Sequence, residues 1–467
     1  MVLRSFRLGN HRSFRDEHEL LLMPAYDKTR PVVPVAAIYG ANAAGKSNLL
    51  DGLRFMAEAV RDSYRSWHPE GGVPRSPYQL DPAADDPSVF VADVVVGGVR
   101  QVYGFVVDDE RVREEWLYAY PRSRRRVLFE RGDDGVSFGS TVSGQRSRKT
   151  ELLAELTRPN ALFLSLAAQV GQPDLLPAYH WFAGSPGTLR FVDGFAGRDL
   201  GKVTTQVARL LERDPSSKRL LLDLLAAADF GITDIHVEQI EQVTPSQFRV
   251  ARRLVGLGSG EGSFRTQEVL RRFIEENPFP LRDGSAAYRV PTSAEVADLP
   301  EIGSTRLRFA HGAGGVLLDL ADESAGTHAW LSVLPAALSA LEGGATLVVD
   351  EIDTSLHPRL TSSLIRLFRS EANPHGAQLL FTTHDATLLG TTFGDDVLDR
   401  DQVWFVEKDS DGASRLYPLT DFYPRKGENT ERRYLVGSYG GVPPDSDLAS
   451  RVLAVREHGE AIGAGAS

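Results

Sequence analysis

The octapeptide Gly40–Ser47 constrains the fold of this chain more than any other segment. Its sequence, Gly40-Ala-Asn-Ala-Ala-Gly45-Lys46-Ser47, satisfies the pattern G-x-x-x-x-G-K-[ST]. The β-branched apolar run from Val32 to Tyr39 predicts a buried strand before it, and the amphipathic pattern from Asn48 to Val60 predicts a helix after it. A strand, a glycine loop and a helix in this order predict an α/β fold with a phosphate-binding loop.

The residue types of this loop suit a nucleoside triphosphate and Mg²⁺. The glycines permit a tight turn and close approach of the backbone N–H groups to phosphate, and the following helix adds the positive end of its dipole. We expect Lys46 to neutralise the terminal phosphates and the Ser47 hydroxyl to bind Mg²⁺. The expected ATP-binding residues of this segment are Gly40, Asn42, Gly45, Lys46, Ser47 and Asn48.

Two later strands end in polar side chains of the kinds that phosphate chemistry uses. The apolar run Thr346 to Glu351 ends in two carboxylates, of which Asp350 would orient hydrated Mg²⁺ and Glu351 would polarise the attacking water. The run Leu379 to Asp385 carries His384 at its carboxyl end, where it could contact the γ-phosphate. Taken alone, each strand end would more often be solvated or structural. The phosphate-binding loop upstream favours the catalytic interpretation.

The spacing of these motifs predicts a large insertion. Roughly 300 residues separate the phosphate-binding loop from Asp350, more than a compact one-lobe nucleotide-binding domain needs. Helical periodicity in the intervening chain and a segment rich in Gly, Pro and Ser at 244–304 favour an inserted, mainly helical lobe. Runs of alternating apolar residues predict an antiparallel β-subdomain, at 89–96, 102–107, 112–120 and 126–130.

A short motif before the Asp350 strand predicts a helix start. Ser324 and Gly326, within Asp322-Glu-Ser-Ala-Gly-Thr327, could cap a helix whose N-terminus faces the γ-phosphate bound by a second subunit, although a simple serine cap is the alternative. The order of loop, insertion, cap and acidic strand is the sequence plan of SMC, RecF and related ABC-type heads. We therefore expect an α/β ABC-type head with a mixed sheet, flanking helices and an antiparallel β-subdomain.

The chain resembles the stand-alone ABC-type ATPases of prokaryotic defence islands, which are usually labelled AAA-family or abortive-infection ATPases. The stretches that carry the resemblance are Asn10 to Phe14, Glu115 to Tyr118, Asn160 to Ser165, Ala227 to Ile232, Glu323 to Thr327, Asp350 to Pro358, Gln378 to Asp385, Gln402 to Lys408, Asp421 to Asn429 and Tyr434 to Gly441. They cover the chain nearly from end to end and match least at 244–300.

The resemblance implies that two heads enclose two ATP molecules. Each site would join the loop, Asp350, Glu351 and His384 of one chain to Ser324 and Gly326 of the other. Arg12 would contact a nucleotide phosphate, and Gln169 would sense Mg²⁺ before the insertion. Hydrolysis would then require a homodimer or a higher homo-oligomer. The expected domains are 1–150 and 305–455 for the two parts of the head, 151–304 for the inserted lobe, and 456–467 for a flexible C-terminus.

Composition limits the expected partners. The net charge of -11 means that nucleic acid, which stays possible, would need a local basic patch. The basic zone at 122–149 offers one, although a solvated face is the better interpretation. The absence of cysteine excludes disulfides and thiolate metal sites, and with no apolar leader or membrane span in the sequence we expect a cytoplasmic protein without a membrane partner.

Three functions follow as hypotheses. The first, from the resemblance, is an ATP-driven sensor or switch in antiviral defence that controls an effector, for example a Toprim-type or other nuclease. The second is a DNA repair or recombination ATPase of the RecF or SMC kind. The third is an ATP-gated scaffold that does not depend on hydrolysis. The tail that includes Arg425 to Tyr439 has no catalytic pattern, and the sequence leaves open whether it docks on the head or on a partner.

Overall fold

The computed structural model describes residues 1–80, 86–140, 142, 148–183, 188–192, 200–213, 215–228, 230–243, 302–312, 314–425 and 427–442. The chain forms two compact units, Met1–Arg198 with Ala329–Ser467 as the first and Asp199–His328 as the second. The expectations for the Gly-rich segment at 244–301 and for the end at 456–467 lie outside the described residues. No helix in the described ranges is long and apolar enough to cross a membrane.

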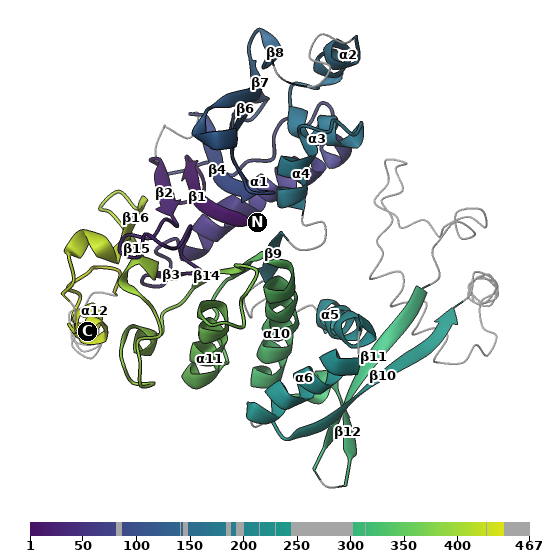
Figure 1. Ribbon diagram of the computed structural model, residues 1–467, viewed down its shortest axis with the longest axis vertical. Coiled ribbons are helices and arrows are strands. Elements are labelled where there is room, and N and C mark those ends of the chain that lie inside the picture. Colours follow the sequence, from purple (N-terminus) through teal and green to yellow (C-terminus); the bar gives the residue numbers. More distant parts are fainter. Residues whose placement is uncertain are drawn as a thin grey trace, which may run out of the picture. The chain divides into compact units, whose positions relative to one another are not determined.

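The first sheet of unit 1 is antiparallel and has the strand order β2-β1-β4-β5-β6-β7-β8 (Figure 1). In β1, β4 and β6, fully buried residues largely alternate with partly or fully exposed ones, as expected for a sheet with one face against a core. This sheet contains the antiparallel β-subdomain predicted from the sequence. The strands are β1 Val2–Gly9, β2 His18–Leu21, β4 Ser88–Val96, β5 Val99–Val107, β6 Val112–Tyr120, β7 Arg126–Gly132 and β8 Gly135–Phe138.

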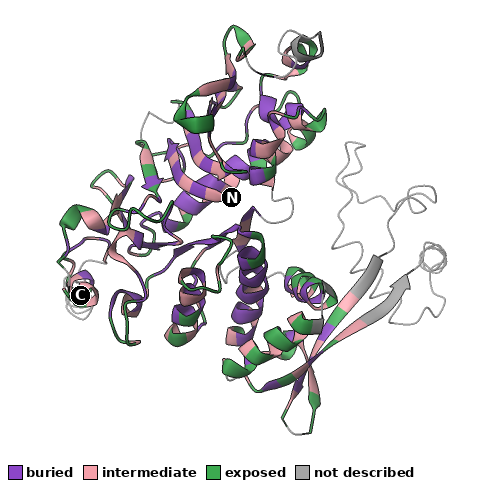
Figure 2. Ribbon diagram, viewed as in Figure 1, coloured by how far each residue is buried: buried purple, intermediate pink, exposed green. Residues whose placement is uncertain are grey.

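The second sheet of unit 1 has the order β16-β15-β3-β14-β13-β9. Strands β15, β3, β14, β13 and β9 are parallel to their neighbours, whereas β16 pairs antiparallel with β15. All residues of the central strands β3, β14 and β13 are buried (Figure 2). The strands are β3 Val35–Tyr39, β9 Leu189–Val192, β13 Thr346–Val349, β14 Gln378–Thr382, β15 Val403–Lys408 and β16 Ser414–Pro418.

Helix α1, Lys46–Ser66, begins at the last residues of the phosphate-binding loop and buries Leu49, Leu53 and Met56 in the main core. It extends beyond the predicted span of Asn48 to Val60. Helices α3 and α4 pack on α1. The other helices with residues in unit 1 are α2 Arg148–Leu156, α3 Phe163–Gln169, α4 Leu176–Ala183, α10 Ala325–Gly343, α11 Pro358–Arg369 and α12 Thr430–Leu435.

A buried glutamine joins the two sheets of unit 1. The side chain of Gln378, on β14, accepts a hydrogen bond from the Leu3 N–H at 2.7 Å and donates to the Leu3 carbonyl at 2.9 Å and the Val33 carbonyl at 3.2 Å. Gln378 is 1% exposed. Because buried polar groups require partners, this side chain fixes the start of β1 against β14.

The described part of unit 2 combines helices α5 and α6 with a three-stranded antiparallel sheet of order β10-β11-β12. The units divide at 198/199 and 328/329, whereas the sequence placed the lobe boundaries at 150/151 and 304/305. The difference arises because α3, α4 and β9 pack on α1 and β13, and because β11 and β12 pair with β10. The elements are α5 Leu200–Arg213, α6 Pro215–Ala227, β10 Ile232–Val243, β11 Ile302–His311 and β12 Val316–Asp319.

Candidate active site

Sterics require both glycines of the phosphate-binding loop. Gly45 has φ 112°, and a Cβ there would lie 2.6 Å from Ser13 Oγ and still closer to the Ser414 hydroxyl. A Cβ at Gly40 would collide with the carbonyl oxygen of Val406 on β15. Since Gly45 precedes α1 directly, its left-handed backbone turns the chain into the helix.

Two serines that the sequence did not single out support this loop through hydrogen bonds. The Ser414 hydroxyl donates to the Ala44 carbonyl at 2.5 Å, and the hydroxyls of Ser414 and Ser13 lie 2.7 Å apart. Asn48 was predicted to bind ATP, and its side-chain amide donates to Ser13 Oγ at 2.7 Å. This side chain therefore bonds to one of the two serines that support the loop. Asn42 is exposed on the loop itself. The sequence patterns predicted no role for Ser13 or Ser414, because these two side chains become neighbours only through tertiary structure.

Lys46 faces both the loop and three carboxylates. Its Nζ donates to the Gly40 carbonyl at 2.8 Å and to the Ala41 carbonyl at 3.1 Å. Burial lowers the pKa of Lys46, and the negative charges of Glu351, Asp350 and Asp353 partly oppose this shift. The acids that follow β13 therefore lie close enough to Lys46 to act on its ammonium group, as the sequence predicted for one phosphate site.

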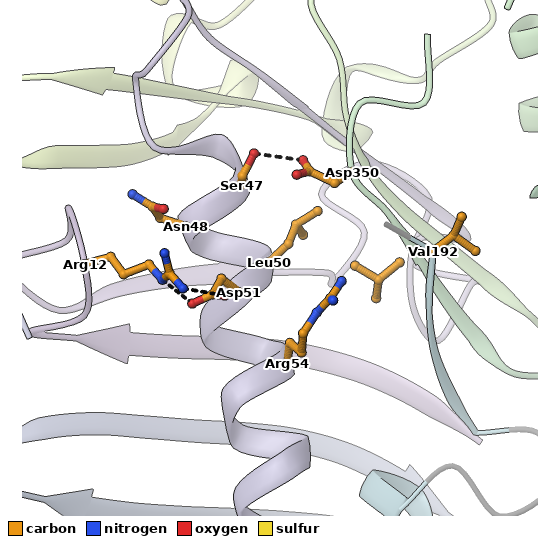
Figure 3. Close-up of a pocket in the computed structure, with 9 residues that line it drawn as sticks. Arg12, Ser47, Asn48, Leu50, Asp51, Arg54, Val192 and Asp350 are labelled. Atoms are coloured by element: carbon orange, nitrogen blue, oxygen red, sulfur yellow. Dashed lines mark hydrogen bonds and ion pairs between the residues drawn. The ribbon is translucent and has the colours of Figure 1, made fainter. Parts of the chain in front are cut away.

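The carboxyl ends of β13 and β14 and the start of α1 meet at Asp350. Its Oδ1 accepts from the Ser47 hydroxyl at 3.0 Å and from the Thr382 hydroxyl at 2.5 Å (Figure 3 shows the first bond). The fully buried Thr382 hydroxyl also accepts from the Glu351 N–H at 2.7 Å. One hydroxyl thus links the predicted metal ligand to the predicted base. Thr382 was not among the residues predicted for the site, although the parallel pairing of β13 with β14 places it beside Asp350.

These oxygen atoms fit a magnesium ion. A serine hydroxyl and a carboxylate oxygen 3.0 Å apart are ligands that Mg²⁺ accepts together with water and nucleotide phosphates. Ser47 and Asp350 would hold the ion, which when bound would neutralise phosphate charge. Glu351 has φ 51°, and its Oε2 accepts from the Thr354 hydroxyl at 3.3 Å. A non-glycine residue in the left-handed region costs conformational energy, and such residues concentrate at functional sites.

His384 lies two residues after the end of β14, at the same edge of the sheet. Its side chain is 59% exposed, and its Nε2 lies 3.3 Å from Oδ2 of Asp353, which is 7% exposed. Asp353 Oδ2 also accepts the His384 backbone N–H at 3.4 Å. The ring is therefore anchored on one side and accessible on the other, as a residue that contacts substrate requires.

Arg12 and Asp51 form an ion pair at the rim of a pocket of about 200 Å³ (Figure 3). Arg12 Nη2 donates to Asp51 Oδ1 at 3.0 Å, and His11 Nε2 lies 2.9 Å from Asp51 Oδ2. Burial raises the pKa of Asp51, but the hydrogen bond from His11 and the charge of Arg12 outweigh burial and lower its pKa overall. The pocket is lined by Arg12, Ser47, Asn48, Leu50, Asp51, Arg54, Val192, Val348 and Asp350.

The structure does not bring Gln169 to this site. Gln169 is exposed at the C-terminal end of α3. The Leu162 and Tyr64 N–H groups bond to the hydroxyls of Ser63 and Ser165, so α3 begins at the end of α1 that is distant from the loop (Figure 1). The role of Gln169 was implied by the family resemblance alone, and the bonds that fix α3 on α1 do not depend on it.

Ser324 and Gly326 belong to a well-formed helix start. The Ser324 hydroxyl accepts from the Thr327 N–H at 3.1 Å, and α10 begins at Ala325, so the predicted serine cap is present. Gly326 lies in the first turn. The side chain of Glu323, only 4% exposed, contacts His311 Nε2 at 2.7 Å. These residues belong to unit 2.

Ion pairs neutralise much of the basic zone. Arg125 Nη2 lies 2.9 Å from Glu130, Arg126 Nη2 lies 3.2 Å from Asp174, and Arg131 Nη1 lies 3.5 Å from the fully buried carboxylate of Glu115. Arg122 and Arg124 are exposed between β6 and β7. Arg146 lies outside the described residues, and the side chains of Arg148 and Lys149 are not described.

Comparison with known proteins identifies one matching family. Residues 35–390 match the family model described as "AAA domain, putative AbiEii toxin, Type IV TA system". These residues run from the start of β3 to Gly390, so they contain the site from the phosphate-binding loop to His384. No curated protein matches the sequence.

Solved structures similar to this chain include two SMC heads. The SMC head domain from Thermotoga maritima is 12% identical, with a TM-score of 0.36, and the match covers 90% of this chain and 99% of that chain. The Smc head domain with an extended coiled coil, bound to the C-terminal domain of ScpA, derives from Pyrococcus furiosus. It is 14% identical, with a TM-score of 0.35, and the match covers 90% of this chain and 97% of that chain.

Proposed function

This chain belongs to the AAA-domain family whose model matches residues 35–390, and we propose that it binds ATP with Mg²⁺ and hydrolyses ATP at a site shared by two copies of the chain. The observation that carries the proposal is the bonded group of Ser47, Asp350, Thr382 and Glu351 beside Lys46. It combines phosphate binding, metal binding and a candidate general base at one sheet edge.

Each residue of the proposed site has a separate role. Lys46 and the loop N–H groups bind the phosphates, and Ser47 and Asp350 hold the metal ion. Glu351 accepts a proton from the attacking water, and His384 contacts the transferred phosphoryl group. Arg12, at the pocket rim, contributes positive charge to the nucleotide.

The first test is ATP turnover by the wild type and by Glu351→Gln, with molecular mass measured with and without ATP and Mg²⁺. We expect Glu351→Gln to lose turnover and to accumulate as an ATP-dependent dimer or larger assembly, because it retains the phosphate and metal ligands. Unchanged turnover would show that Glu351 is not the base. A wild type that binds ATP but does not turn it over would favour the ATP-gated scaffold.

A mixing experiment tests the shared site. Lys46→Ala removes phosphate binding, and Ser324→Arg blocks the helix start that would face the partner's nucleotide, so each variant alone should be inactive. In a random mixture half of the dimers are heterodimers, and each contains one intact site, so about a quarter of wild-type turnover should return if the two sites act independently. A Ser324→Arg variant with normal turnover when pure would refute the shared site.

We propose that this ATPase is a switch in antiviral defence that holds or releases an effector, with a Toprim-type or other nuclease as the leading candidate. The family description, which names a toxin of a type IV system, supports this role. Co-expression of the wild type or Glu351→Gln with a candidate Toprim-type nuclease, followed by phage challenge, tests it. Equal protection by both chains would refute an ATP-driven switch.

The exposed Arg122 and Arg124 favour one alternative, a DNA-stimulated ATPase. Turnover would then rise with added DNA and lose this stimulation at higher salt. An Arg122→Ala, Arg124→Ala double variant would abolish the stimulation and leave basal turnover unchanged. No stimulation by single-stranded or double-stranded DNA in the wild type would exclude this alternative.

A further inference from the structure

The C-terminal segment made of residues 421–425 and 427–442, called the tail below, docks on the head beside the phosphate-binding loop. The Tyr434 ring, on α12, lies 5.4 Å from that of Tyr39, the last residue of β3, and 5.6 Å from that of Phe405 on β15. The Tyr439 ring also stacks on Phe405, at 5.7 Å. The sequence left open what the tail docks on. In the structure the tail packs against β3, the strand that leads into the loop.

The Tyr434 hydroxyl connects the tail to the first glycine of the loop. It donates to the Gly441 carbonyl at 3.2 Å, and Tyr434 is 4% exposed. A Cβ at Gly441 would lie 3.5 Å from the Gly40 Cα, so the two backbones are in contact. Burial raises the pKa of Tyr434 to about 12, the charge of Asp353 adds to this shift, and a hydrogen bond from the Gly40 backbone opposes it.

The same helix contacts the segment that follows His384. α12 packs against the 3₁₀ turn Ala386–Leu389. The Glu431 side chain lies over Gly390, where a Cβ would collide with Glu431 Oε2. The Tyr39 hydroxyl donates to the Asp385 carbonyl at 3.2 Å. The tail thus contacts both the start of the phosphate-binding loop and the chain directly after the candidate catalytic histidine.

We propose that the tail is part of the ATP-binding apparatus and that Tyr434 is a positioning residue, which acts on ATP through Gly40. The Gly40 carbonyl accepts from Lys46 Nζ, so a shift of this glycine would also shift the lysine that neutralises phosphate. Fixing Gly40 before ATP arrives lowers the conformational cost of ordering the loop on binding. This inference rests on the proposed binding and hydrolysis of ATP.

A solely structural tail would give a different result. The aromatic rings bury apolar surface whether or not the Tyr434 hydroxyl is present, so a structural role would appear as a loss of thermal stability. A positioning role would appear as weaker ATP binding. Tyr434→Phe separates the two, because it keeps the ring and removes only the hydroxyl.

The test compares Tyr434→Phe with Tyr439→Phe. Both side chains belong to the aromatic cluster, but of the two hydroxyls only that of Tyr434 bonds to Gly441, whose backbone contacts Gly40. Equilibrium binding of ATP, KM and kcat for ATP, and the unfolding midpoint without nucleotide are measured for both variants and the wild type. We expect Tyr434→Phe to raise Kd and KM about five- to tenfold, the value of one hydrogen bond, with kcat changed less than about twofold. Tyr439→Phe should match the wild type in Kd and KM.

Each other outcome identifies which idea fails. If the wild type binds and hydrolyses ATP and Tyr434→Phe has the wild-type Kd, the positioning role is wrong and the proposed function stands. If both variants weaken binding equally, the effect belongs to the packing of the cluster, and the inference is also wrong. A wild type that does not bind ATP overturns the proposed function and the inference with it.

Discussion

Removing the Thr382 hydroxyl should disconnect the metal ligand from the base. Thr382→Val keeps the shape of the side chain, and Thr382 is fully buried, so few other contacts change. The variant loses the 2.5 Å bond to Asp350 and leaves the Glu351 N–H, 2.7 Å away, without its acceptor. We expect lower kcat and a higher Mg²⁺ concentration for half-maximal turnover.

The magnitude follows from these two bonds. A hydrogen bond to a charged group contributes about 1.5–3 kcal/mol, and an ordinary one such as that from the part-buried Glu351 N–H contributes about 0.5–1.5 kcal/mol. If the site recovers roughly half of this sum by relaxation, about 1–2.3 kcal/mol remains against the reaction, which corresponds to a roughly 5- to 50-fold loss of kcat/KM.

Thr383→Val is the matched control for this substitution. Thr383 is the next residue and is also fully buried, but its hydroxyl accepts from the Asp385 N–H at 3.0 Å and has no bond to Asp350. Turnover is measured across a Mg²⁺ titration, together with the free energy of unfolding. Wild-type Mg²⁺ dependence and kcat in Thr382→Val would refute the coupling. Equal losses in both variants would assign the effect to general destabilisation of β14.

Three further outcomes are expected. Because burial lowers the pKa of Lys46, its charge is lost at a lower pH than that of an ordinary lysine. The value of kcat/KM for ATP should therefore fall on the alkaline side. A pH profile of kcat/KM that is unchanged in Lys46→Arg would contradict this. Asp51→Asn should lower the free energy of unfolding at neutral pH and make that free energy less dependent on pH in acid. The lowered pKa of Asp51 gives stability that is present above its unfolded pKa and is lost as pH falls through its folded pKa. Denaturant titrations at several pH values measure this, and parallel curves for variant and wild type would refute it. Gln378→Leu should reduce the free energy of unfolding by about 2–4 kcal/mol, since it leaves the Leu3 N–H and carbonyl without their buried partner. A reduction below about 0.5 kcal/mol would refute the idea that Gln378 joins the two sheets.

The sequence was most informative where chemistry and local pattern coincide. The segment around Gly40–Ser47 predicted a strand before the loop and a helix after it, and the apolar runs ending at Asp350 and His384 predicted two buried strands that carry site residues at their carboxyl ends. The structure pairs these two strands in parallel, beside the strand that leads into the loop. In each case a few consecutive residues determine both the backbone and the side chain that it presents. The antiparallel sheet was predictable for the same reason.

The remaining features depend on contacts between distant segments. Thr382, Asp51, Ser13 and Ser414 belong to the site because separate elements meet there, and the sequence patterns predicted no role for these four side chains. Gln169 illustrates the converse, since the resemblance implied a role in the site for a side chain that lies exposed at the end of α3. The boundary of the inserted lobe also depended on packing, because the helices at 163–183 look alike in sequence whether they cover α1 or a separate lobe.

The position of Ser414 beneath the loop has a consequence for synthesis of the chain. Its hydroxyl bonds to the Ala44 carbonyl across 370 residues. At ribosomal rates of about 5–20 residues per second, roughly 20–70 seconds pass between the emergence of the loop and that of its support. During that interval the nascent chain contains the phosphate-binding loop but lacks the Ser414 hydroxyl that bonds to it. Competence to bind nucleotide therefore arises late in translation, and a chain that terminates before Ser414 lacks a properly supported loop.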